Sequence, residues 1–196
     1  LITGVAGTIG SALLKRLANK YNCEKIIGID NNESELFFVD QDFTNNDSVF
    51  LYLADIQSQA DCTHFTKNVD IVFHCAALKH VILCEKSPMY AVTNNLIGLE
   101  NLIQAASDNS VEKFIFTSSD KAVNPTNVMG TSKLMGERLV TSSSSKNSDS
   151  DTIFTSTRFG NVLGSNGSVI PIFKKQIKKG GPITLTDEQM TRFIMS

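Results

Sequence analysis

The stretch TSSDKAVNPTNVMGTSK, residues 117–133, gathers several side chains that could move protons. An acid and a base stand side by side as Asp120 and Lys121, and Met129 is followed four positions later by Lys133. A carboxyl group and an amine serve as general acid and general base when their surroundings tune them toward neutral pH. Met129 carries no acidic proton, so a thioether there can only pack against a reacting group. We therefore predict a proton-transfer site, with a surface Asp–Lys pair and a purely core-packing methionine as the alternatives.

A glycine loop, TGVAGTIG at residues 3–10, is the second chemical signal. It follows a strand-like run and precedes a helical pattern, as a loop that binds a dinucleotide must. Gly4 would allow a tight turn, Gly7 would let the backbone approach a pyrophosphate at the positive end of the helix, and Gly10 would let helix and strand pack closely. The alternative is that these glycines serve turns alone.

An acidic residue in the expected place supports the dinucleotide interpretation. Asp30 lies twenty positions beyond Gly10, at the end of the second strand-like run. Its carboxylate could accept hydrogen bonds from ribose hydroxyls, and residues 31–33 include no cation that would neutralise a 2′-phosphate. This favours NAD over NADP. Further along, Asp55 and Ile56 follow another strand and could hold the adenine edge, although a solvent-facing turn is the alternative.

These residues need a scaffold, and apolar β-branched runs alternate with helical patterns along the chain. Such alternation predicts an α/β fold with a doubly wound parallel sheet, whose ligands bind at the carboxyl ends of the strands. We expect strands at the N-terminus and at 25–29, 50–54, 70–76, 113–118 and 152–159, and helices at 11–21, 91–106 and 127–140.

The remaining segments suggest how the chain is divided. Residues 141–151 are rich in Ser and predict a mobile surface loop. After Phe159 the chain is rich in Gly and Pro, with one short amphipathic helix near 168–179. We therefore expect a NAD-binding domain at 1–160 and an incomplete substrate-binding region at 161–196. We also expect the natural chain to begin before Leu1, because the opening strand is short and no initiating Met is present.

Composition limits the class of protein. The 196 residues are 41% hydrophobic, which suffices for a buried core, and the formal net charge is −2. Such a net charge does not indicate nucleic-acid binding. No apolar run reaches the ~20 residues that a membrane-spanning helix needs. The four cysteines lack CxxC spacing, so we expect reduced thiols in a cytoplasmic protein rather than a metal site or disulfides.

Five segments in order carry a family resemblance: TGVAGTIG, HCAALKHV, SSDKAVNPTNVMGTSK, RFGNVLGSNGSVIPIF and MTRFIMS. The chain resembles extended short-chain dehydrogenases/reductases with a Rossmann-like fold, and within them the polysaccharide-biosynthesis branch of nucleotide-sugar 4,6-dehydratases. The resemblance covers essentially the whole chain. It departs from the wider superfamily where a YxxxK motif reads MxxxK, from Met129 to Lys133, and from its own subgroup where Ser119 replaces the usual Thr.

The resemblance implies a reaction in three steps. A hydride passes from C4 of a UDP-sugar to NAD, water is lost across C5 and C6, and the hydride returns to C6. Asp120 would protonate the leaving hydroxyl, for which burial must raise its pKa, and Lys121 would be the base at C5. Ser119 is the nearest candidate to take the C4 hydroxyl proton. Lys133 would hold the nicotinamide ribose.

The resemblance also assigns binding residues and partners. Asn161 and Arg192 would contact the diphosphate, Val169 and Pro171 would line the uridine site, and Lys79 would reach the sugar. His80 is more plainly a structural residue. Thr8, Ile9 and Ala76 complete the expected cofactor site. We expect a homo-oligomer without nucleic-acid or membrane contact from this segment, although longer family members carry N-terminal membrane anchors.

The expected activity is a NAD-dependent UDP-N-acetylhexosamine 4,6-dehydratase, with UDP-N-acetylglucosamine as substrate, acting in surface polysaccharide synthesis. One alternative is a nucleotide-sugar 4-epimerase, which uses the same cofactor but usually keeps the tyrosine. Another is a catalytically weak NAD-binding protein, which Met129 and the apparent truncation of the chain would favour.

Overall fold

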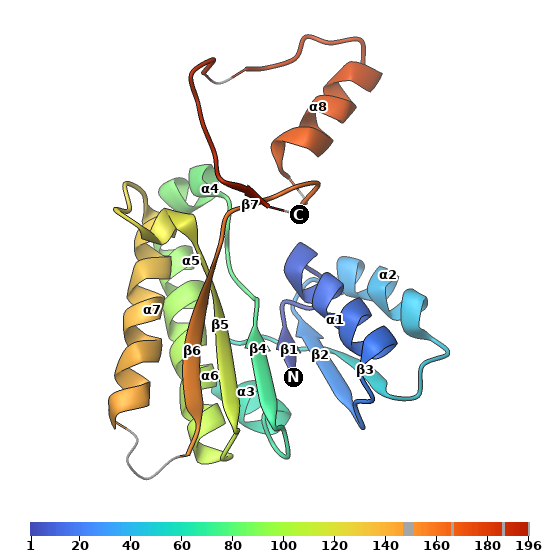
Figure 1. Ribbon diagram of the computed structural model, residues 1–196, viewed down its shortest axis with the longest axis vertical. Helices are drawn as coiled ribbons and strands as arrows, with labels where there is room; N and C mark the ends of the chain where they lie inside the picture. Colours follow the sequence, from blue (N-terminus) through green and yellow to red (C-terminus); the bar gives the residue numbers. More distant parts are fainter. Residues whose placement is uncertain (147–150, 166, 186, 196) are drawn as a thin grey trace.

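The computed structural model describes residues 1–146, 151–165, 167–185 and 187–195. Its centre is a six-stranded sheet in the order β3-β2-β1-β4-β5-β6 (Figure 1), and every pair of neighbouring strands in it is parallel. The strands are β1 (Ile2–Thr3), β2 (Ile26–Asp30), β3 (Val49–Leu53), β4 (Ile71–His74), β5 (Lys113–Ser119) and β6 (Ile153–Phe159).

This order confirms the doubly wound fold. The chain builds outward from β1 to β3, then crosses back and builds outward again from β4 to β6. The switch point therefore lies between β1 and β4, and ligands of such sheets bind there, beyond the carboxyl ends of the strands. The glycine loop directly follows β1, so the topology brings it to this point.

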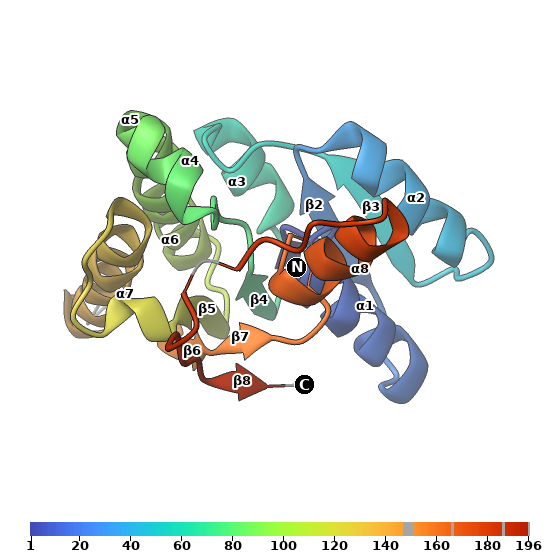
Figure 2. The ribbon, with the colours of Figure 1, turned by 90° about the horizontal axis from the view of Figure 1, so that it is seen from above.

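Helices cover both faces of the sheet (Figure 2). One apolar cluster joins Leu14 of α1 and Leu36 of α2 to β1 and β2, while a larger one joins α3, α6 and α7 to the opposite face through residues such as Phe114 and Leu102. The helices are α1 (Thr8–Lys20), α2 (Glu33–Phe43), α3 (Gln59–Phe65), α4 (Val81–Lys86), α5 (Pro88–Val92), α6 (Gly98–Asp108), α7 (Val128–Lys146) and α8 (Val169–Lys178).

Several expectations about local structure need correction. The six strands lie where the sequence placed them, but α2 and α3 were not expected, although both have a side-chain N-cap. Asn32 accepts from the Glu35 amide and Ser58 from the Asp61 amide. The loop expected at 141–151 was wrong for 141–146, because α7 continues to Lys146. Residues 147–150 of that prediction lie outside the described residues.

A small second layer stands over the carboxyl ends of the sheet (Figure 1). Strands β7 (Asn161–Val162) and β8 (Ile194–Met195) pair in parallel, and α8 lies between them in the chain, close to its expected range. Gly160 allows the close pairing, since a Cβ there would lie 2.8 Å from the Phe193 carbonyl oxygen. Residues far apart in the sequence are thus brought above the switch point.

Candidate active site

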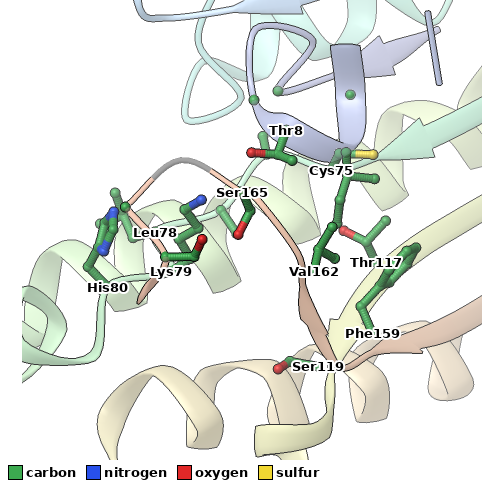
Figure 3. A pocket seen from close by; sticks show the side chains of 18 of the residues that line it. Thr8, Cys75, Leu78, Lys79, His80, Thr117, Ser119, Phe159, Val162 and Ser165 are labelled. Atoms are coloured by element: carbon green, nitrogen blue, oxygen red, sulfur yellow. The ribbon is translucent and has the colours of Figure 1, made fainter. Parts of the chain in front are cut away.

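A cavity of about 700 Å³ opens between the main sheet and this second layer. Figure 3 shows Thr8 of the glycine loop at one end and Ser119, the last residue of β5, at the other. Most residues singled out from the sequence line it: Gly4, Gly7, Thr8, Ile9, Gly10, Asp30, Asp55, Ile56, Ala76, Lys79, Ser119, Lys121, Met129, Lys133, Asn161, Val169 and Arg192. Asp120 and Pro171 are not among the lining residues.

The glycine loop has the backbone geometry expected of a phosphate site. Gly4 has φ +67°, and a Cβ there would lie 2.6 Å from the Ala76 amide nitrogen. A Cβ on Gly10 would overlap the Gly4 carbonyl oxygen. Gly7 caps α1 without a side chain, and the first turn of α1 holds no acidic residue. The positive end of α1 is therefore open to an anionic group.

The end of β2 suits the ribose of an adenosine. Asp30 accepts from the Ala6 and Asn32 amides, each at 3.0 Å, which fixes its carboxylate against the glycine loop. A carboxylate has about four acceptor sites, so capacity remains for ribose hydroxyls. Glu35, which the sequence reasoning missed, also lines this end. Two carboxylates disfavour a 2′-phosphate there, so the residues fit NAD.

At the opposite end four side chains form one hydrogen-bonded network. The Ser119 hydroxyl donates to Asp120 Oδ1 at 2.9 Å, and Lys121 Nζ donates to the same oxygen at 3.0 Å. Lys121 Nζ also donates to Asn161 Oδ1 at 2.9 Å. The strand ends at Ser119 and a 3₁₀ turn, η2 (Asp120–Ala122), follows, so adjacent side chains can converge on one site.

The expected state of Asp120 was wrong for this structure. Burial alone would raise its pKa, but hydrogen bonds from Lys121 and Ser119 outweigh burial, and the net shift is downward. The carboxylate accepts from both of these donors, and Asp120 is not among the residues that line the cavity. Asp120 is thus a carboxylate at neutral pH in this state.

Lys133 reaches the cavity from within the core. Its side chain is 6% exposed, and Nζ donates to the Thr117 carbonyl at 2.8 Å and lies 4.7 Å from the Phe116 ring centroid. Burial lowers its pKa to about 8. Burial also raises the pKa of the neighbouring Cys75 to about 12 and lowers that of His74 to about 3.

Met129 lies both in an apolar cluster and in the cavity wall. It is 4% exposed and packs with Cys84 and Ala91, yet it also lines the cavity. Met129 lies four positions before Lys133 in α7, and its thioether has no proton to exchange. The position that a tyrosine would hold in the wider superfamily is therefore occupied by an apolar wall.

The expected substrate-binding residues are partly brought together. Lys79, Val169 and Arg192 line the cavity, and burial lowers the pKa of Lys79. Pro171 does not line it, because two residues along a helix turn the side chain by about 200° from Val169. His80 lies against the backbone at Gly167, since a Cβ on Gly167 would meet its ring at 2.5 Å.

Asn95 is a residue that the sequence reasoning missed. It lies in the π-helix η1 (Thr93–Ile97) and is 3% exposed. Its carboxamide accepts from the Leu78 amide at 2.8 Å and donates to the Leu78 carbonyl and to Ser132, each at 3.0 Å. Asn95 thereby ties the segment that carries Lys79 to the helix that carries Lys133. The signal available in the sequence was the polar Asn95 among the apolar residues of the helix predicted at 91–106.

The described residues offer no metal site and no membrane-spanning helix. No group of three or more His, Cys, Asp or Glu side chains there could hold a metal ion, and the four cysteines are free thiols. Among the same residues no helix combines the length and apolarity that crossing a bilayer requires.

Known proteins match this chain over its whole length. An uncharacterized membrane protein of Methanocaldococcus jannaschii is 48% identical over 196 residues, and a UDP-glucose 4-epimerase of Rickettsia bellii is 41% identical over 203. Both alignments cover all of this chain but 58% of the relative. The chain therefore spans little more than half the length of these relatives.

Solved structures agree with the fold. Pen from Bacillus thuringiensis matches with a TM-score of 0.96 and 41% identity, over 99% of this chain and 61% of Pen. A UDP-glucuronic acid 4-epimerase from Bacillus cereus, solved with UDP-glucuronic acid and NAD, matches with a TM-score of 0.87 and 25% identity, over 98% of this chain and 67% of that one. The family model described as polysaccharide biosynthesis protein matches residues 1–196, so this chain belongs to that family of extended short-chain dehydrogenases/reductases.

Proposed function

We propose that this chain carries the catalytic site of a NAD-dependent nucleotide-sugar 4,6-dehydratase in polysaccharide synthesis, with UDP-N-acetylglucosamine as substrate. The observation that carries the proposal is the Ser119–Asp120–Lys121 network at the end of a cavity whose other end fits NAD. An epimerase needs no acid to expel a hydroxyl and no base at C5. Residues 161–196 would begin the sugar-nucleotide-binding region.

NAD bound at the glycine loop would supply reversible hydride transfer at the sugar carbons. The chain's own residues then handle the protons. Ser119 lies in the cavity wall and donates to Asp120, so it can take the proton of the C4 hydroxyl while passing its own to the carboxylate. This role requires Asp120 to begin as a carboxylate, which agrees with its lowered pKa.

The same transfer prepares the elimination. Asp120, once protonated, can give its proton to the C6 hydroxyl, which leaves as water. Lys121 Nζ lies 3.0 Å from Asp120 Oδ1. To act as the C5 base, Lys121 must first give one ammonium proton to solvent. Lys121 then takes the C5 proton and later returns it to C5. The proton lost from the C4 hydroxyl is thus the one that departs in water.

The decisive experiment is incubation of the intact protein with NAD and UDP-N-acetylglucosamine, followed by mass spectrometry. A product lighter by one water supports the dehydratase. Lys121→Ala should abolish exchange of the C5 proton with deuterated solvent, since loss of a positioned base costs about 10²–10⁴-fold. Equal exchange in Lys121→Ala and the parent would refute the assignment of the base.

A 4-epimerase is the second candidate, because the relative from Rickettsia bellii is named a UDP-glucose 4-epimerase. The two activities separate in the same experiment, since epimerisation leaves the mass unchanged and alters retention on chromatography. NAD binding without turnover of any UDP-sugar would instead favour a binding protein. Cytoplasmic location and self-association stay predictions.

A further inference from the structure

We propose that Asn161 is a positioning residue that aims the Lys121 amine, so that the strand pair β7–β8 sets the geometry of the elimination step. The inference rests on the proposed function. Its basis is the contact of 2.9 Å between Lys121 Nζ and Asn161 Oδ1, which joins residues forty positions apart. The resemblance in sequence gave Asn161 only a diphosphate contact.

The chemistry of the two groups fixes the orientation of the amide. Lys121 Nζ donates in this contact, so the oxygen of Asn161 faces it and accepts. The amide nitrogen, which carries two donor hydrogens, is then left for an acceptor such as an oxygen of the sugar nucleotide. Asn161 can therefore contact Lys121 and substrate at once.

The two acceptors also fix the direction in which Lys121 can react. Two tetrahedral positions of Nζ are taken by Asp120 Oδ1 and Asn161 Oδ1. The remaining direction carries the third proton of the ammonium or the lone pair of the amine. Since Lys121 lines the cavity, holding both contacts restricts where that lone pair points. Without Asn161 the flexible side chain would keep one anchor, on its own turn.

The backbone of Asn161 ties this contact to the second layer. Its amide donates to the Phe193 carbonyl at 2.8 Å, and the Leu163 amide donates to the Met195 carbonyl at 2.9 Å. Arg192, which lines the same cavity, directly precedes Phe193. A sugar nucleotide that engages Arg192 would therefore act on the strand that holds Asn161 in place.

Three variants of the intact protein test the inference. Asn161→Ala removes the acceptor, Asn161→Asp replaces it with a carboxylate of the same shape, and Asn45→Asp is the matched control, because Asn45 is exposed in the loop before β3. The measurements are C5 proton exchange in deuterated solvent, NADH formation, KM for the UDP-sugar, and the pH dependence of each.

We expect Asn161→Ala to slow C5 exchange at saturating substrate by about 10²-fold, the cost of a small misplacement of a reacting group. NADH formation should fall much less. A carboxylate at 161 would hold the ammonium charged to higher pH, so Asn161→Asp should move the acid limb of C5 exchange upward by about 1–3 pH units. The other charged groups lining the cavity are unchanged: Asp30, Glu35, Asp55, Lys79, Lys133 and Arg192.

Two results would overturn the proposal. If Asn161→Ala raises KM but leaves C5 exchange at saturation intact, Asn161 is a substrate ligand only. If Asn161→Asp and Asn45→Asp give the same acid limb as the parent, Asn161 does not act on Lys121.

A readout without substrate separates this inference from the proposed function. The ¹⁵Nζ shift of Lys121, assigned by its absence in Lys121→Arg, should titrate at higher pH in Asn161→Asp than in the parent. If the Lys121 shift moves in this way while no UDP-sugar is turned over, the positioning contact stands and the dehydratase proposal fails. If the Lys121 shift does not move while dehydration proceeds, the dehydratase proposal stands and the positioning role of Asn161 fails.

Discussion

Lys133 is a buried cation, and replacing it should make the protein more stable while disabling it. Its side chain is 6% exposed, and its ammonium has one hydrogen bond, to the Thr117 carbonyl. Burial lowers its pKa from 10.5 to about 8. Lys133→Met keeps an unbranched chain of similar length and removes the charge.

The magnitude follows from that shift. A pKa difference of one is worth about 1.4 kcal/mol, so at pH 7 the buried ammonium of Lys133 destabilises the folded state by on the order of 3 kcal/mol. Losing its hydrogen bond to Thr117 costs about 1 kcal/mol. We therefore expect Lys133→Met to raise the free energy of unfolding by about 2 kcal/mol at pH 7, and to lose activity because Lys133 lines the cavity.

The sign of the pH dependence gives a second check. Between pH 8 and 10.5 the folded state has released the Lys133 proton, whereas the unfolded state still binds it. As the pH rises from 8 to 10.5, the free energy of unfolding of the parent should therefore increase relative to that of Lys133→Met. Urea unfolding at pH 7 and at pH 10 measures both effects, with the exposed Lys67→Met as the control. If Lys133→Met is less stable than the parent at pH 7 and has the same pH dependence, Lys133 does not carry a buried charge.

Three further predictions follow from the site. Asp30→Ala should narrow the preference for NAD over NADP in fluorescence titrations, and equal affinity of the unmutated protein for both would contradict the argument from Asp30. Met129→Leu should keep most dehydration measured by mass spectrometry, since volume-conserving swaps cost less than about 1.5 kcal/mol; a loss above tenfold would give the thioether a chemical role. Asn95→Ala removes the hydrogen bonds to the Leu78 amide and carbonyl and to Ser132 and should lower the free energy of unfolding by about 2–3 kcal/mol, measured by urea unfolding against the exposed Gln104→Ala.

Local sequence patterns were enough to predict the sheet. Runs such as KIIGI and KFIFTS are apolar and β-branched because central parallel strands are buried on both faces, and they became β2 and β5. Helices on the outside of the sheet are harder to predict from the apolar pattern. In α2, Phe37 and Phe38 stay more than half exposed, so its apolar residues do not follow a single stripe.

The helix predicted at 91–106 shows why spacing alone can mislead. Val92 and Leu96 stand at helical spacing, four positions apart, but both are only partly buried. The π-helix η1 inserts a residue into the turn, so Asn95 is buried instead. Such bulges are frequent at functional sites, and here the bulge delivers a carboxamide to the segment beside the cavity.

The motif at residues 117–133 could not reveal which residues distant in the sequence contact its side chains. The stretch around Asp120 and Lys121 indicated an acid and a base, and we expected burial to set Asp120 as the acid from the start. The structure adds two hydrogen bonds to that carboxylate and a partner from β7 to the lysine, and together they reverse the expected order. In the proposed mechanism Asp120 first accepts a proton and then donates it, which requires a low pKa at rest and a donor beside it. Ser119 would be that donor. The proposed order would also remove the need for a tyrosine at position 129, because the proton of the C4 hydroxyl would pass through Ser119 to Asp120.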